Sequence, residues 1–202
     1  MSLIKYSTRE ITCKIVYYGP GRCGKTTNLQ YIHRRTPPAR KGEMMSLATE
    51  TDRTLFFDLL PLDVGKIGPY TVRFQLYTVP GQVYYDSTRR LVLQGADGVV
   101  FVVDSQKERF EDNLESFENL MVNLKENGLS IETIPVVVQY NKRDLPEIFD
   151  PEEFHKYIAW LDPPWFEAIA IRGDGVIPTF KEIGKRVLHS LKERFRSSGR
   201  RG

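Results

Sequence analysis

Eight consecutive residues near the N-terminus have the types and spacing of a phosphate-binding loop. Gly19 to Thr26 read Gly-Pro-Gly-Arg-Cys-Gly-Lys-Thr, which matches the pattern G-x-x-x-x-G-K-S/T. The end glycines, Gly19 and Gly24, allow backbone angles that turn successive N–H groups toward one bound anion. Lys25 supplies a cation for the outer phosphates, and the Thr26 hydroxyl can bind Mg²⁺. The sequence therefore predicts a nucleoside-phosphate site with a magnesium ion.

A second motif, Asn141-Lys142-Arg143-Asp144, follows an apolar run and can read a nucleobase. The Asp144 carboxylate can accept hydrogen bonds from the ring N–H and the exocyclic amine of guanine, whereas adenine would leave it unpaired. Asn141 can bind the other edge of the base or tie this loop to the phosphate loop, and Lys142 can lay its aliphatic stem on the ring. The motif favours a guanine nucleotide over the alternative, a P-loop kinase or ATPase.

The pattern of the remaining chain predicts the elements that position these motifs. Residues 11–18 alternate like a strand just before the phosphate loop, and residues 25–35 fit a helix whose N-terminus adds partial positive charge. Further strands are expected at residues 55–64, 71–78, 98–104, 134–140 and 166–170. Strand and helix signals alternate, which predicts an α/β fold with a six-stranded, mostly parallel sheet and helices on both faces. The glycine-rich connection 65–70 predicts a hairpin, so one edge pair should be antiparallel.

Three more helices are expected in the second half of the chain. Apolar residues recur at helical spacing over 114–124 and again over 180–195. Asp150-Pro151-Glu152-Glu153 has the pattern of a helix start, with Asp150 as cap and Glu153 closing a capping box.

Length and composition bound the class of protein. A chain of 202 residues suits one domain, and we expect it to span 1–196, with 197–202 as a disordered tail. The net charge of +3 is too small to indicate nucleic-acid binding. We expect no integral membrane span, since no apolar run reaches about 18 residues. The N-terminus is not a signal peptide, and Cys13 and Cys23 predict no disulfide framework, so a cytoplasmic location is expected.

Together the two motifs resemble the Ras-like small GTPase superfamily over about residues 10–195. The segment 78–82 reads Thr-Val-Pro-Gly-Gln, where most of the superfamily has D-x-x-G-Q. With residues 53–57 (Arg-Thr-Leu-Phe-Phe), this departure is similar to the bacterial MglA-type GTPases, which act in cell polarity and gliding motility. The resemblance implies a GTP-hydrolysing switch that uses Mg²⁺ and is recruited to a cell pole. It also implies an activator that resembles an MglB-type roadblock homodimer, while effectors and exchange factor stay unidentified.

The resemblance assigns roles to single positions. Gly21 falls where a bulkier side chain disturbs hydrolysis, and Thr54 corresponds to the switch I threonine that contacts Mg²⁺. Gly81 corresponds to the switch II glycine whose N–H meets the γ-phosphate, and Gln82 to the glutamine that orients the attacking water. Ala170 matches the third base-contacting loop, with its backbone N–H toward the base.

Arg53 precedes Thr54 and can swing onto the transferring phosphate, as an arginine finger supplied in the same chain. The alternative is a solvated loop arginine. The predicted catalytic residues are thus Gln82, Arg53 and Lys25, and the predicted metal ligands are Thr26 and Thr54. The predicted nucleotide-binding residues are Gly19, Pro20, Gly21, Arg22, Cys23, Gly24, Lys25, Thr26, Thr27, Gly81, Asn141, Lys142, Asp144 and Ala170.

Thr78 stands where the superfamily has an aspartate that holds Mg²⁺ through a water molecule. Threonine keeps a hydroxyl but carries no charge, so another carboxylate can compensate. Asp52, Asp58 and Asp104 are the candidates, and the sequence does not rank them. Thr78 also motivates an alternative function, a GTP-binding scaffold with negligible turnover.

Overall fold

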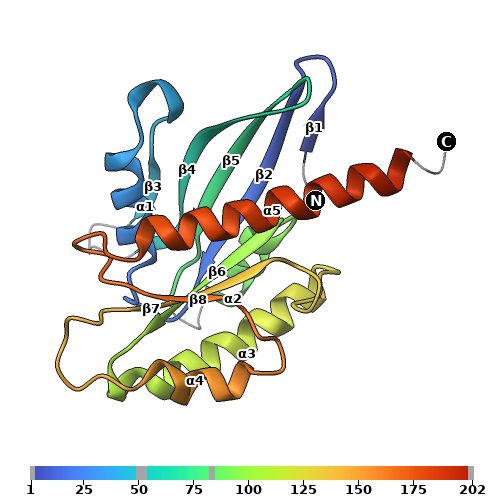
Figure 1. Ribbon diagram of the computed structural model, residues 1–202. Coiled ribbons are helices and arrows are strands. Elements are labelled where there is room, and N and C mark those ends of the chain that lie inside the picture. The colour runs from blue at the N-terminus through green and yellow to red at the C-terminus, as the bar shows by residue number, and fades with distance from the viewer. Residues whose placement is uncertain (1–2, 49–53, 82–84, 200–202) are drawn as a thin grey trace.

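The structure is a computed structural model that describes residues 3–48, 54–81 and 85–199. One twisted sheet forms its centre (Figure 1). Its strands are β1 (Leu3–Lys5), β2 (Glu10–Tyr18), β3 (Met45–Ala48), β4 (Thr54–Ile67), β5 (Tyr70–Thr78), β6 (Gly98–Asp104), β7 (Val136–Asn141) and β8 (Trp165–Glu167). Its helices are α1 (Lys25–Arg35), α2 (Asp86–Leu93), α3 (Phe110–Glu126), α4 (Pro151–Ile158) and α5 (Val176–Gly199), with short 3-10 turns η1 (Pro38–Arg40) and η3 (Lys107–Arg109).

The strand order is β3-β4-β5-β2-β6-β7-β8, and β1 pairs with β2. The pairs β2–β5, β2–β6, β6–β7 and β7–β8 are parallel, whereas β1–β2, β3–β4 and β4–β5 are antiparallel. The predicted α/β fold, with its mostly parallel sheet and its hairpin of β4 and β5, is confirmed. The structure also contains two short strands, β1 and β3, and the helix α2, which the sequence did not predict.

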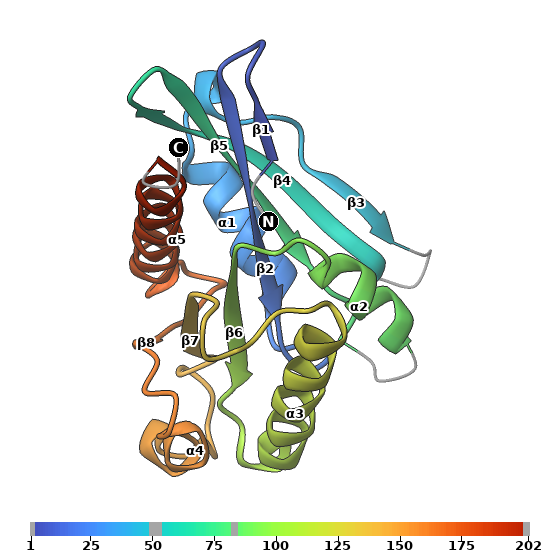
Figure 2. The same ribbon diagram turned by 90° about the vertical axis from the view of Figure 1, so that its right-hand side faces the viewer.

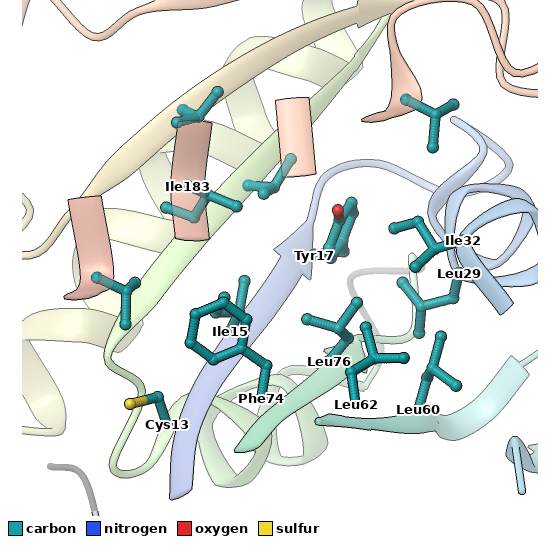
Figure 3. Packing of buried hydrophobic residues seen from close by; sticks show 14 of the residues in the cluster. Cys13, Ile15, Tyr17, Leu29, Ile32, Leu60, Leu62, Phe74, Leu76 and Ile183 are labelled. Carbon is teal, nitrogen blue, oxygen red and sulfur yellow. The ribbon is translucent and has the colours of Figure 1, made fainter. Parts of the chain in front are cut away.

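Each face of the sheet carries its own hydrophobic core, because the buried strands are apolar on both sides. Figure 2 shows α1 and α5 on one face and α2 and α3 on the other. The first core joins Tyr17 of β2 and Leu76 of β5 to Leu29 of α1 and Ile183 of α5 (Figure 3). The second joins alternate residues of β6 and β7 to α2, α3 and α4, with Phe101 packed against Phe117 and Phe154. The sheet is therefore held rigidly between two helical layers.

Helix ends follow the chemistry expected of them. At α4, the Asp150 carboxylate accepts from the Glu152 N–H at 2.9 Å, and Glu153 accepts from the Asp150 N–H at 2.9 Å, which confirms the capping box. Helix α5 continues to Gly199, past the expected start of the tail at 197, and Phe195 stacks on Tyr70 of the long hairpin at 6.3 Å between ring centroids. Among the described residues, no helix has the length and apolar character needed to cross a membrane.

Candidate nucleotide-binding site

The phosphate loop joins the end of β2 to the start of α1, in the middle of the sheet. Two of its glycines have left-handed backbone angles, Gly19 with φ 142° and Gly24 with φ 101°. A Cβ atom added to Gly19 would collide with the carbonyl oxygen of Val102, and one added to Gly24 with the side-chain amide of Asn141. Both positions therefore require glycine for conformation and for space.

The Lys25 ammonium group is buried inside the loop that it is expected to serve. It donates to the carbonyl oxygens of Gly19 at 3.0 Å and Pro20 at 2.6 Å, and lies 3.6 Å from the Cys23 sulfur. Burial is the largest cause that lowers the pKa of Lys25. A buried cation held by neutral carbonyls is well suited to an anionic ligand, because phosphate oxygens would offset its desolvation.

Asn141 joins the phosphate loop to the base-reading loop. Its amide nitrogen donates to the Cys23 carbonyl at 2.7 Å, and its side-chain oxygen accepts from the Ala170 N–H at 2.9 Å. Of the two roles open for Asn141 in the sequence, the structure shows the tie to the phosphate loop. The Ala170 N–H, which the resemblance places toward the base, bonds to the Asn141 oxygen in this structure.

Lys142 and Asp144 follow Asn141 in the same motif, after the end of β7. Lys142, at φ 66°, donates to the Asp104 carboxylate at 2.6 Å and to Gln106 at 3.2 Å. This ion pair links the loop after β7 to the end of β6 and occupies Asp104. Asp144 is exposed in the loop after β7. Asp104 is therefore paired with the Asn141–Asp144 motif.

Asp58 is the carboxylate that lies beside Thr78. It is fully buried on β4 and accepts from the hydroxyls of Thr26 at 2.6 Å and Thr78 at 2.7 Å. The Ser46 hydroxyl donates to its other oxygen. No cluster of three or more His, Cys, Asp or Glu occurs in the described part of the chain, so a metal here would need water and phosphate ligands as well. This oxygen-only donor set fits Mg²⁺, which usually keeps several waters and takes substrate phosphates.

The start of switch II rests directly on the phosphate loop. A Cβ atom added to Gly81 would collide with the backbone of Gly21. The buried guanidinium of Arg89, on α2, donates to the carbonyls of Pro80 at 2.9 Å and Gly81 at 2.7 Å. It also donates to Asn119 of α3 at 2.8 Å. Helix α3 thus supports, through Arg89, the backbone on either side of the predicted phosphate-binding N–H.

Three residues that support the site lie outside any sequence motif, and their roles were not predicted from the sequence. Asp58 was one unranked candidate among three, and Arg89 was not considered. Arg109, which donates to the Gly21 carbonyl at 3.1 Å and pairs with Asp112 at 2.6 Å, was not considered either. For Asp58, a charged residue in the middle of an apolar strand was the feature of the sequence that could have indicated a functional role.

Several of the residues predicted from the sequence lie outside the described part of the chain or at its edge. Arg53, Gln82 and Asp52 lie outside the described residues. Thr54 is described only as the first residue of β4. Pro20 and Cys23 are buried within the loop, Arg22 is exposed, and Thr26 and Thr27 are half-buried at the start of α1.

A parallel sheet with a phosphate loop and a guanine-reading motif side by side at its carboxyl edge defines a small GTPase. The chain belongs to the ADP-ribosylation factor family, whose model matches residues 1–181. It is 58% identical over 193 residues to the mutual gliding-motility protein MglA of Myxococcus xanthus, covering 96% of this chain and 99% of that protein. Identity to the Ras-related protein Rab-5B of Plasmodium falciparum is 29% over 126 residues, with 61% and 57% of the two chains covered.

Identity to the ADP-ribosylation factor-like protein 6 of Caenorhabditis elegans is 23% over 185 residues, with 89% of each chain covered. The resemblance to the MglA-type GTPases is confirmed. The protein is a small GTPase, a GTP hydrolase.

Proposed function

We propose that this GTPase is a molecular switch for gliding motility and cell polarity, built around one guanine nucleotide and one Mg²⁺ ion. The observation that carries the proposal is the double hydrogen bond of Asn141, to Cys23 at 2.7 Å and Ala170 at 2.9 Å. It joins the phosphate loop to the base loop, so a nucleotide can be read at both ends by one rigid unit.

Guanine reading belongs to the loop after β7. The carboxylate of Asp144 would accept from the ring N–H and the exocyclic amine of guanine. Lys142 is held along the loop by Asp104 at 2.6 Å, which leaves its aliphatic stem as a surface for the base. The buried tie of Asn141 keeps these two residues at a fixed distance from the phosphate loop.

The phosphates would bind to Gly19–Thr27, the stretch that includes Lys25. Mg²⁺, when bound, neutralises charge on the β- and γ-phosphate oxygens. Thr26 and Thr54 are the proposed protein ligands. Lys25 would exchange its carbonyl partners for phosphate oxygens, which are stronger acceptors because they are charged.

Hydrolysis requires a positioned water and stabilised charge on the transferring phosphate. Gln82 would orient the water, and Arg53 would reach the phosphate from switch I. The Gly81 N–H would meet the γ-phosphate. Because a trans peptide points its N–H away from its C=O, the bond from Arg89 to the Pro80 carbonyl fixes the direction of the Gly81 N–H.

The cellular role is proposed from the relative that covers nearly the whole chain, a mutual gliding-motility protein. GTP would order switch I and switch II, and GDP would release them. We propose a cytoplasmic protein recruited to a cell pole and stimulated by an MglB-type roadblock homodimer. The alternative, a GTP-binding scaffold with negligible turnover, makes the opposite prediction for hydrolysis.

Single-turnover hydrolysis of GTP tests the proposal. The protein alone should turn over at about 10⁻⁴ to 10⁻² s⁻¹, and an MglB-type homodimer should accelerate it. Gln82→Ala should keep GTP affinity and lose the stimulated rate, because only the water-orienting amide is removed. Gln94→Ala, at the exposed end of α2, is the matched control and should behave as the wild type. Full stimulation of Gln82→Ala would remove Gln82 from the mechanism, and no turnover under any condition would favour the scaffold.

A further inference from the structure

The carboxylate of Asp58 lies in a row of side chains that crosses three strands. Leu59 pairs with Tyr77, which places Asp58 opposite Thr78 of β5, and Ser46 of β3 pairs with Asp58 on its other side. Both neighbours donate their hydroxyls to the carboxylate, and the Asp58 N–H donates to the Thr78 oxygen at 2.9 Å. From the helix layer above the strands, Thr26 donates to the same carboxylate at 2.6 Å.

A β-bulge sets this row. Ile67 pairs with Tyr70 at the turn of the hairpin, and the register shifts between Asp63 and Gly65. Without that one-residue shift, Asp58 would lie opposite Val79 and its side chain would face the wrong neighbours. The bulge therefore brings a carboxylate of β4 to the hydroxyl that a carboxylate of β5 reaches in the wider superfamily.

The hydrogen bonds of Asp58 do not neutralise its charge, so this charge can act on a nearby metal ion. Within the described part of the chain, its hydrogen-bond partners are three hydroxyls, while Lys25 acts on it only through space. Burying an ionised carboxylate without a bonded cation is costly, and a metal ion nearby would offset that cost. Asp104 is already paired with Lys142.

We propose that Asp58 is the residue that takes over the Mg²⁺-holding role that Thr78 lacks. Asp58 accepts a hydrogen bond from the Thr26 hydroxyl, which turns the lone pairs of that oxygen toward the ion. The negative charge of Asp58 also strengthens metal binding. It acts as a positioning residue from outside the first coordination shell. In this chain the carboxylate therefore comes from β4 and the facing hydroxyl from β5. This inference rests on the proposed function, because Mg²⁺ and GDP belong to it.

The test measures release of a fluorescent GDP analogue from the full chain as a function of free Mg²⁺. Asp58→Asn keeps the shape of the side chain and removes its charge. It should raise the Mg²⁺ concentration that half-maximally slows GDP release by about 10- to 100-fold, the effect of losing an outer-shell partner. In EDTA, the variant and the wild type should release GDP at the same rate. Asp63→Asn is the matched control, because this carboxylate is also on β4 and accepts from the Gly65 N–H at 3.0 Å, close to the turn of the hairpin.

A double variant, Asp58→Thr with Thr78→Asp, returns the carboxylate to β5 and should recover most of the lost Mg²⁺ affinity. An unchanged Mg²⁺ dependence in Asp58→Asn would overturn the proposal. Equal acceleration of GDP release with and without Mg²⁺ would do so too, because it would mark a structural defect. If circular dichroism shows that neither Asp58 variant folds, Asp58 is a framework residue and the proposal falls. Failure of the wild type to bind GDP would instead refute the proposed function.

Discussion

Gly24 shows how much of this site depends on a single missing side chain. Its φ of 101° is strained for any residue with a Cβ atom, and that atom would collide with the Asn141 amide. The same amide ties the base loop to Cys23 at 2.7 Å. A change at Gly24 would therefore disturb phosphate and base reading together.

We expect Gly24→Ala to lower GDP affinity by at least about tenfold, because backbone strain and displacement of Asn141 add. Gly128→Ala is a close control, since Gly128 has φ 69° and open space where the Cβ atom would lie. It should lose some thermal stability and keep its GDP affinity. Isothermal titration of both variants, each checked for its melting temperature, gives the comparison. Equal loss of affinity in the two variants would assign the effect to backbone strain alone.

Residues in contiguous motifs could be predicted from the sequence. Gly19–Thr27 and Asn141–Asp144 are each one contiguous stretch, so the spacing of their residues already indicates which groups come together. Asp58 was not ranked, because its partners Thr78 and Ser46 lie on other strands and depend on a bulge that no turn signal indicates. The bond from the Ala170 N–H to Asn141 was not predicted either, because the two residues lie far apart in the sequence and meet only in the folded chain.

At the scale of elements, α2 and α3 support switch II. Tyr18, Asp86, Arg89, Asn119 and Asn123 form one hydrogen-bonded network under the start of α2. Arg89 stands at its centre, and its guanidinium also lies over the Tyr18 ring at 5.1 Å. Helical periodicity could have placed Arg89 on a helix face, but not its docking against α3, which is a long-range contact.

Arg89→Met should weaken binding of a non-hydrolysable GTP analogue relative to GDP by about tenfold, because only the γ-phosphate needs the fixed Gly81 N–H. Loss of the bonds to the Pro80 and Gly81 carbonyls should also cost about 1–3 kcal/mol of stability. Arg90→Met is the matched control, since Arg90 is exposed on the same helix and forms an ion pair with the exposed Glu126. A fall in affinity for both nucleotides by one factor would mean that Arg89 is merely structural.

At the scale of the molecule, an activator can work by shifting populations. Arg53 precedes Thr54, the first residue of β4. We therefore expect a movement that brings Thr54 to Mg²⁺ to move Arg53 near the phosphates as well. A partner that holds the switch regions in this state needs no catalytic arginine of its own.

We therefore expect Arg53→Ala to abolish stimulation by an MglB-type homodimer and to leave binding of that partner largely intact. Single-turnover GTP hydrolysis, with each surface arginine of the partner replaced in turn, provides the test. One partner arginine whose loss removes stimulation and spares binding would reassign the finger to the partner. Arg53 would then be a solvated loop residue.

The central claim is that the joined loops form a guanine-specific site, and paired binding of GDP, XDP and ADP tests it most directly. The wild type should bind GDP far more tightly than ADP or XDP. Asp144→Asn should lose GDP affinity by about two orders of magnitude or more and gain affinity for XDP, because its amide can donate to the second carbonyl of xanthine. ADP binding as tight as GDP binding by the wild type would contradict the account, as would an Asp144→Asn variant with unchanged base preference.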